Sequence, residues 1–363
     1  MIIPDCFFNH CKGRRNHRIP VLQESEIIQL YENIRQLPSL DIYYSHDLKV
    51  YDEISEKVKA GNRDNVTRTT FYLSFFNKHP DIHWAFLAHM VSRNAGYHMT
   101  DIRSRLLSAF LTEREQADLF SFLDLCNAAI FRDAFPQLLL YEKWKETGRT
   151  FFHLLRKFHV SAFMRTVWDR FLSNGNQSML TVAMIMNEQH MVENRILLQP
   201  EVNFGVEKWK FLLQDRLEFA SILFPHGERH PLSLAGHGVS HFEQVHRRIL
   251  LGKRLYQILF HQSVYPSALS FANHHVHTGS RSDYWPHIYT SHDTPSRLYS
   301  PFLRDVWDES ALISVPTSDW FTDQTIDVMM PLSSLPTPRH FSMSKKWKTK
   351  TSVLLTLKRE QRK

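Results

Sequence analysis

The chain has 363 residues, of which 43% are hydrophobic and 22% charged, so it can form one large domain or two ordinary ones around a buried core. Its 11 glycines are too few for the turns and bulges of a large β-sheet or dinucleotide-binding fold, which disfavours both classes. The net charge of +7 is concentrated at the ends: residues 344–363 hold eight Lys or Arg and one Glu, and residues 1–18 hold four basic side chains and one acidic. Any case for nucleic acid is therefore weak and rests on the basic tail.

Cysteine usage and hydropathy indicate the cellular compartment. Cys6, Cys11 and Cys126 are too few, and odd in number, for a disulfide framework, and they fit a reducing environment. No stretch approaches the roughly 20 apolar residues of a membrane helix, and residues 1–15 lack the pattern of a signal peptide. The sequence predicts a soluble cytoplasmic protein without a membrane span, and no cofactor is expected unless a divalent metal binds as considered below.

Apolar positions three and four residues apart predict helices through most of the chain up to about residue 272. The expected ranges are 26–36, 50–60, 64–78, 82–94, 112–134, a segment from Pro136, 162–174, 178–196, 206–222 and 241–262. The start signals are N-cap residues and capping boxes, at Asp64, Ser161, Thr112 with Glu115, and Ser240 with Glu243. Gly96 is expected to lie beyond the end of the 82–94 helix, and Pro136 is expected to open a new one.

After about residue 273 the helical period is lost, and proline, serine, threonine, aspartate and histidine dominate. The aromatic residues in this part are too many for a disordered tail. We therefore predict an all-α, multi-helix globular bundle with an extended, aromatic- and His-rich C-terminal segment packed over it. The expected parts are a flexible basic N-terminus (1–20), a helical core domain (21–272), the irregular segment (273–335), and a basic tail that is disordered or a lone amphipathic helix (336–363).

Several polar residues interrupt helices that are otherwise apolar and expected to be buried. Because an unpaired buried charge costs on the order of several kcal/mol, these groups must find partners. We expect one interior network in which Arg93 or Arg132 faces Glu188. It could line a ligand-binding cleft with His190 as a general base, or it could be a structural network that fixes helix register. The residues are Arg93, Asn94, Asn127, Arg132, Asp133, Asn187 and Glu188.

Five segments resemble the YppC-like family, a bacterial family of unknown function found in Bacillus and its relatives. The resemblance covers about residues 20–320 and implies a cytosolic bacterial protein; it assigns no activity and no site residues. The basic tail after residue 336 lies outside it. The segments are NVTRTTFYLSFFNKHPDIHWAFLAHMVSRNAGYHMTD (65–101), RDAFPQLLLYEKW (132–144), NEQ (187–189), LGKRLYQILF (251–260) and HTGSRSDYWP (277–286).

Eleven of the 22 histidines fall between residues 226 and 292, which raises the question of a metal site. His275 and His277 have a spacing that can chelate a metal from an extended strand, and Asp283 could complete the site, with Asp293 as a further ligand. No established metal-binding signature is present, however. Packing and hydrogen bonding are the favoured roles for these residues.

The stretch HTGSRSDYWP offers a second candidate, an anion-contacting loop at 277–286. Arg281 could bind a phosphate through two hydrogen bonds, and Tyr284 and Trp285 could stack on a base. Alternatively, Arg281 and Asp283 form ion pairs within the protein while the two aromatic side chains anchor the segment.

Motifs of nucleophilic hydrolases and of nucleotide-binding loops are absent from the sequence. We therefore expect a non-catalytic binding or scaffold protein whose partner is an anionic ligand or another protein. The alternative is a metal-assisted or acid–base hydrolase that uses the His- and Asp-rich C-terminal segment.

Overall fold

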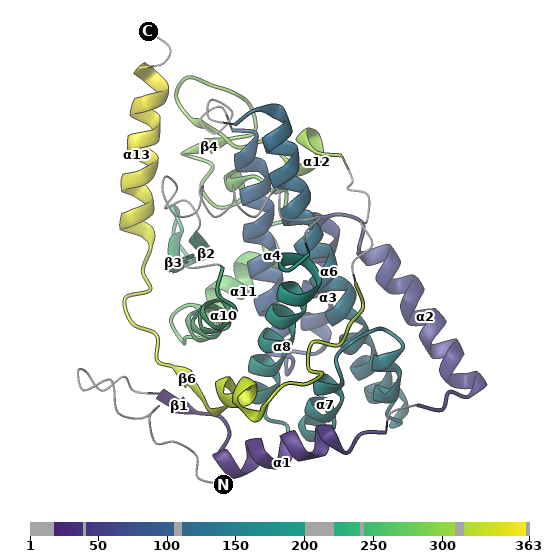
Figure 1. Ribbon diagram of the computed structural model, residues 1–363. Helices are drawn as coiled ribbons and strands as arrows, with labels where there is room; N and C mark the ends of the chain where they lie inside the picture. Colours follow the sequence, from purple (N-terminus) through teal and green to yellow (C-terminus); the bar gives the residue numbers. More distant parts are fainter. Residues whose placement is uncertain are drawn as a thin grey trace.

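The computed structural model describes residues 18–38, 41–104, 111–199, 221–239, 243–308 and 316–360, and these are mostly helical, as predicted (Figure 1). The α-helices are α1 (Glu24–Arg35), α2 (Ser45–Gly61), α3 (Asn65–Lys78), α4 (His83–Ile102), α6 (Glu113–Thr147), α7 (Ala162–Asn174), α8 (Gln177–Val192), α10 (Val245–Leu259), α11 (Tyr265–His274), α12 (Leu303–Val306) and α13 (Ser344–Glu360). Short 3₁₀ or π turns are η2 (Phe152–Arg156), η3 (Glu193–Leu197), η6 (Arg281–Asp283) and η7 (Ile326–Ser333).

The described strands form three small pairs, and only the first of them joins distant parts of the chain. Strand β1 (Arg18–Pro20) is antiparallel to β6 (Ser334–Pro336), and β2 (Ser221–His226) is antiparallel to β3 (Ser233–Gly238). Strand β4 (Tyr289–Thr290) is parallel to β5 (Leu298–Tyr299). Each of these strands has at most six residues, and each sheet has two strands. The pairs therefore do not form the core of the described structure.

The hydrophobic core is built around α4 and α8. Helix α8 is apolar on nearly every side from Met179 to Met186, which requires neighbours all round it. It packs against α4, α6, α7 and α10, while α3 lies along α4. In Figure 1, α3, α4, α6 and α8 run through the centre, with α10 and α11 to one side and α2 to the other.

Three of the four predicted helix caps lie where the sequence placed them. Asp64 caps α3 by accepting from the backbone N–H of Thr67. Thr112 and Glu115 form the expected capping box of α6, and Ser161 caps α7. A side-chain oxygen at these positions satisfies an N–H group that has no partner within the helix.

Two predicted helix boundaries are wrong, because tertiary packing overrides the local signal. Helix α4 continues through Gly96 to Ile102. A Cβ atom at Gly96 would lie 2.4 Å from Oδ1 of Asn65 and 2.5 Å from Nε2 of His277, so this glycine permits a close approach and does not end the helix. Helix α6 continues through Pro136, since buried aromatic and aliphatic side chains on both sides of the proline hold the helix in the core.

Two further predictions fall partly outside the described residues. Of the helix expected at 206–222, only 221 and 222 are described, and they belong to strand β2. The helix expected from about residue 241 begins at Val245, and Ser240 of its expected capping box is not described.

The basic C-terminal stretch contains helix α13, which runs along one edge of Figure 1. Its Trp347 is 1% exposed and donates to the hydroxyl of Tyr289, so the helix is attached to the body. The division of the chain into four parts stays a prediction.

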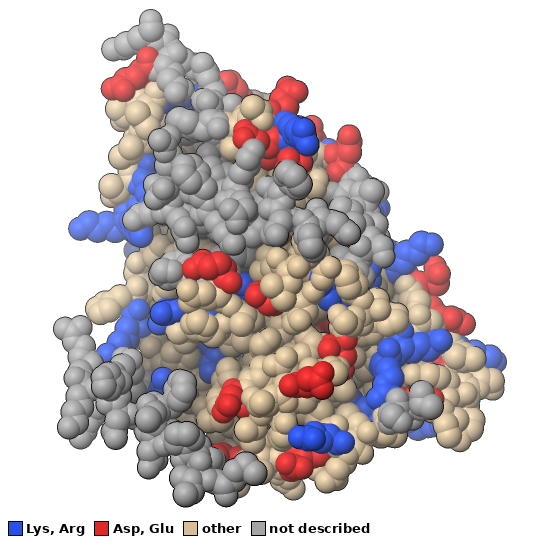
Figure 2. Space-filling model, in the orientation of Figure 1, with Lys and Arg blue, Asp and Glu red and all other residues tan. Residues whose placement is uncertain are grey.

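Acidic and basic side chains are interspersed on the face shown in Figure 2, and neither sign covers a continuous area there. This mixture agrees with the near cancellation of charges in the body of the sequence. Among the described helices, none has the length and apolar character needed to cross a membrane.

Candidate functional site

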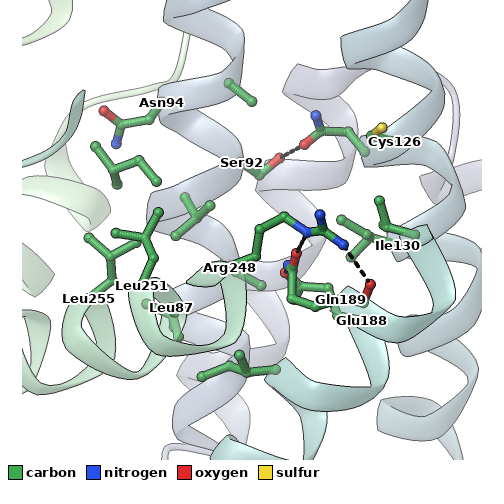
Figure 3. A pocket seen from close by; sticks show the side chains of 18 of the residues that line it. Leu87, Ser92, Asn94, Cys126, Ile130, Glu188, Gln189, Arg248, Leu251 and Leu255 are labelled. Atoms are coloured by element: carbon green, nitrogen blue, oxygen red, sulfur yellow. Dashed lines mark hydrogen bonds between the residues drawn. The ribbon is translucent and has the colours of Figure 1, made fainter. Parts of the chain in front are cut away.

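A cavity of about 210 Å³ lies between helices α4, α6, α8 and α10, beside the start of strand β2 (Figure 3). Its wall is mainly aliphatic. Gly252 lets α10 approach α8 closely, because a Cβ atom there would lie 2.7 Å from Cγ2 of Ile185. Such a wall suits the apolar body of a small molecule. The aliphatic lining includes Leu87, Val91, Ile130, Ile185, Leu251 and Leu255.

One part of the cavity wall is polar and consists of Glu188, Gln189 and Arg248, which we call the polar wall (Figure 3). Nε of Arg248 donates to Oε1 of Gln189 at 2.9 Å, and its Nη2 donates to the Glu193 carboxylate at 2.5 Å. Nε2 of Gln189 donates to Oε1 of Glu188 at 2.5 Å. The Arg248 charge is thus already paired with Glu193, whereas Glu188 receives hydrogen bonds from neutral groups.

Glu188 is the titratable group of the polar wall with an unusual acidity. Burial raises its pKa to about 7, although the side chains of Gln189 and Trp84 donate hydrogen bonds that lower the pKa. The charge of Asp133 raises the pKa more than that of Arg248 lowers it. The carboxyl group therefore changes protonation close to neutral pH.

Aromatic side chains also line the cavity. Tyr72 and Trp84 interact with Glu188 of the polar wall, and Phe122 is a further lining residue. The Tyr72 hydroxyl is buried and has no hydrogen-bond partner in the part of the chain that the structure describes. Cys126 also lines the cavity, and burial raises the pKa of its thiol to about 12, which makes it unreactive.

A second group of buried charges, here called the loop cluster, consists of Arg93, His277, Arg281, Asp283 and Tyr284. Arg281 is 1% exposed. Its Nη2 donates to Asp101 at 2.6 Å, and its Nη1 donates to the Tyr284 hydroxyl at 2.9 Å. An anion could reach this guanidinium only by displacing Asp101, so the geometry does not favour the expected anion-contacting role.

The remaining charges of the loop cluster are paired in the same way. Nη2 of Arg93 lies 3.4 Å from Oδ2 of Asp283, and Nε of Arg93 donates to the Tyr97 hydroxyl at 2.8 Å. Burial raises the pKa of Asp283, but the nearby His277 side chain, the charge of Arg93 and hydrogen bonds from Thr278 outweigh burial and lower it below its usual value. This carboxylate is therefore held in its ionised form by the protein itself.

The three predicted metal ligands do not converge. Nε2 of His277 lies 3.0 Å from Oδ1 of Asn65, and Nδ1 of His277 accepts from the backbone N–H of Gly279, so both ring nitrogens are engaged. His275 stacks on Phe271 and contacts its carbonyl oxygen. Asp283 lies 3.6 Å from His277. Within the described ranges, no group of three or more His, Cys, Asp or Glu side chains is arranged to hold a metal ion.

The expected single interior network is divided among separate clusters, and the predicted pairing of Arg93 or Arg132 with Glu188 is wrong. Arg93 joins the loop cluster, and Arg132 is exposed. Asp133 accepts from Nδ2 of Asn187 at 2.5 Å, and burial raises its pKa to about 6. Only Glu188 of these charged groups lines the cavity.

Four other candidates also have defined places. Asn94 lines the cavity, but its side chain exchanges two hydrogen bonds with the backbone of Leu223 and so ties α4 to β2. Asn127 lines the cavity and accepts from Ser92 at 3.4 Å. Trp285 is fully buried and donates to the carbonyl of Leu232. His190 stacks on Trp320, and burial together with the charge of Arg248 lowers the pKa of its imidazole to about 4.

Sequence reasoning missed Arg248, Tyr72 and Trp84. A signal for Arg248 was present, because residues 248, 252, 255 and 259 are three or four apart and share one face of α10. An arginine on an otherwise apolar face indicates a buried charge that needs a partner. Tyr72 and Trp84 carried no signal that distinguished them from ordinary core aromatics.

Comparison with known proteins places this architecture in a family. The family described as "Protein of unknown function (DUF2515)" matches residues 60–347, which includes every element around the cavity and the start of α13. The "Uncharacterized protein YppC" of Bacillus subtilis (strain 168) is 37% identical over 275 residues, which cover 75% of this chain and 83% of that protein. No solved structure matches significantly. The chain belongs to the DUF2515 family, as its resemblance to YppC-like proteins predicted.

Proposed function

We propose that the protein binds a small, mainly apolar molecule in the cavity between α4, α6, α8 and α10, and that binding is its primary role. The observation that supports this proposal is the combination of an aliphatic wall with a polar wall formed by half-buried Glu188 and Gln189 and buried Arg248. Small-molecule sites commonly have this composition: apolar surface supplies affinity, and a few polar groups fix orientation. The ligand would therefore have an apolar body and one polar group.

The side chains around the cavity support binding over nucleophilic catalysis. The Cys126 thiol has a pKa of about 12, so it is protonated at neutral pH. The Ser92 hydroxyl is hydrogen bonded to Asn65, Thr69 and Asn127, none of which is a base. A nucleophile needs an adjacent base or a lowered pKa, and neither of these two side chains has one among the described residues.

An acid–base hydrolase is the second candidate function, and one observation favours it. The pKa of Glu188 is about 7, which is the value that suits a general acid or base at neutral pH. This form of the enzyme hypothesis depends on Glu188 and not on the His- and Asp-rich segment. It requires turnover of the bound molecule, which the binding hypothesis does not.

We also propose that the segment 273–335 acts as a packing element over the helical body and not as a ligand loop. Its aromatic side chains support this: Tyr284, Trp285 and Trp320 are each at most 3% exposed. The cysteine content still favours the cytoplasm as the site of action.

The test of binding is a thermal-unfolding screen with indole and 1-octanol, comparing the wild type with two variants. Ala88 lines the cavity, so Ala88→Phe should fill it, while Ala117 is exposed on α6, and Ala117→Phe serves as the control. A ligand at ten times its Kd adds roughly 1.4 kcal/mol of stability, which raises Tm by a few degrees. We expect this rise for the wild type and Ala117→Phe, and none for Ala88→Phe. An equal rise in all three proteins, or in none, would contradict binding in this cavity.

A further inference from the structure

We propose that the molecule bound in this cavity is an apolar primary amine whose ammonium group is held by the carboxylate of Glu188, against the aromatic side chains of Tyr72 and Trp84. The inference rests on the proposed binding function and names its ligand class. Four observations support it: the charge balance of the polar wall, the aromatic groups beside it, the unpartnered hydroxyl of Tyr72, and the size of the cavity.

The charge balance favours a cation. Arg248 is paired with Glu193 at 2.5 Å. Glu188 has no Lys or Arg nitrogen within ion-pair distance among the residues that the structure describes, and its hydrogen-bond donors, Gln189 and Trp84, are neutral. A ligand carboxylate would add a second negative charge beside Glu188, whereas an ammonium group supplies the charge that the wall lacks.

The groups that face Glu188 from the surrounding helices strengthen this preference. Asp133 on α6 acts on Glu188 more strongly than Arg248 on α10, so the two together leave a negative field at the carboxyl group. The charge of Glu188 also raises the pKa of Tyr72 on α3. A negative field stabilises a bound cation and opposes an anion.

Aromatic side chains and an unsatisfied oxygen provide the rest of an ammonium site. Aromatic faces attract ammonium groups, and the attraction is stronger where the ammonium group is removed from water. Tyr72 and Trp84 pack edge to face with ring centroids 5.6 Å apart, and both line the cavity with Phe122. The Tyr72 hydroxyl, which is buried and lacks a partner among the described groups, could accept one of the three ammonium hydrogens.

The cavity volume limits the size of the amine. An engineered apolar cavity of about 150 Å³ holds benzene, so a cavity of about 210 Å³ corresponds to roughly eight or nine non-hydrogen atoms. A single ring with a short aminoalkyl chain fits this limit. Polyamines do not fit, because a second ammonium group would lie against the aliphatic wall without a partner.

Binding of an ammonium group requires ionised Glu188, so affinity depends on pH. With a pKa of about 7, the carboxyl group is roughly nine-tenths protonated at pH 6 and almost fully ionised at pH 8.5. An alkyl amine keeps its positive charge over this range, since amines of the lysine type have pKa values of about 10. The Kd for an amine should therefore fall about tenfold from pH 6 to pH 8.5.

The experiment is isothermal titration calorimetry with three molecules of similar size: 2-phenylethylamine (cationic), 2-phenylethanol (neutral) and phenylacetate (anionic). The proteins are the wild type, Glu188→Gln and the filled-cavity variant Ala88→Phe. We expect the amine to bind the wild type at least tenfold more tightly than the alcohol at pH 8.5, with about tenfold weaker amine binding at pH 6. Glu188→Gln should bind the amine and the alcohol equally and show no such pH dependence.

The outcomes separate this inference from the proposed function. If the alcohol or phenylacetate binds the wild type as tightly as the amine at pH 8.5, and Ala88→Phe abolishes that binding, the cavity binds ligands but the amine inference is wrong. If amine affinity is unchanged in Glu188→Gln, the role given to Glu188 is wrong. If none of the three molecules binds the wild type at either pH, the proposed binding function is contradicted as well.

Discussion

Two sets of buried or half-buried charges differ in whether the protein pairs each charge with an opposite one. In the loop cluster, Arg281 is paired with Asp101, and Asp283 with Arg93. In the cavity, Glu188 is hydrogen bonded to neutral groups and its pKa is about 7. Buried charges that are paired with an opposite charge hold the fold together, whereas a charge that lines a cavity and lacks an opposite charge is a candidate for contact with a ligand.

The loop cluster should therefore be essential for stability, and Asp101→Ala is the most severe test of it. Removing the carboxylate leaves the Arg281 guanidinium, 1% exposed, without its ion pair. Breaking such a pair from one side costs on the order of 3–5 kcal/mol. We expect a loss of this size in the free energy of unfolding, measured by urea denaturation followed by circular dichroism.

The matched control for this variant is Asp118→Ala, because Asp118 is exposed on α6. A surface change of this kind should alter the free energy of unfolding by no more than about 0.5 kcal/mol. A loss below about 1 kcal/mol for Asp101→Ala would mean that Arg281 readily finds other partners, and the contrast between the two clusters would then fail.

Removing the charge of Glu188 from the cavity should raise the free energy of unfolding, because the ionised carboxylate destabilises the ligand-free fold. Its pKa rises from an ordinary 4.5 to about 7 on folding, so the native state binds a proton that the unfolded state releases between these pH values. The stability contributed by this group is thus lost as the pH rises from about 4.5 to about 7. Glu188→Gln carries no such charge and should avoid the loss.

We expect Glu188→Gln to match the wild type in stability at pH 4 and to exceed it at pH 8 by on the order of 2–3 kcal/mol, since one pKa unit corresponds to about 1.4 kcal/mol. Urea denaturation at pH 4, 6 and 8 measures the difference. A variant that is less stable than the wild type at pH 8 would show that Glu188 already has a charged partner within the fold.

The sequence could predict features that depend on neighbouring residues, and it failed where a distant segment decides. Asp64, Thr112 and Ser161 were correctly identified as helix caps because a cap acts on an N–H two or three residues away. Gly96 resembles a residue beyond a helix end when only its neighbours are considered, because its close approach to Asn65 and His277 involves segments outside its own helix.

The same distinction explains which site residues were found. Glu188 was identified as a buried polar residue from its apolar surroundings on α8, but its neighbour Arg248 lies on another helix, 60 residues away. Periodicity places a residue on a face of its own helix; it does not show which helices that face contacts. The choice of Arg93 or Arg132 as the partner of Glu188 was therefore beyond what a single sequence determines.

The smallest expected effect concerns His275, and it tests the metal-dependent alternative directly. His275 is half-buried, and its ring stacks on Phe271, whereas His277 is 5% exposed and lies within hydrogen-bond distance of Asn65 and Gly279. His275→Ala should change the free energy of unfolding by about 0.5 kcal/mol or less. His277→Ala should cost roughly 2 kcal/mol, because it leaves buried polar groups unsatisfied.

If the two histidines bound a metal together, elemental analysis of the tag-free wild type would find near-stoichiometric zinc, manganese or iron, and each alanine variant would lose it. We expect the metal content to be the same in His275→Ala and the wild type, because the His275 ring stacks on Phe271 and belongs to no group of three or more metal-ligating side chains among the described residues. A metal that disappears with His275 alone would move the hydrolase hypothesis ahead of the binding one.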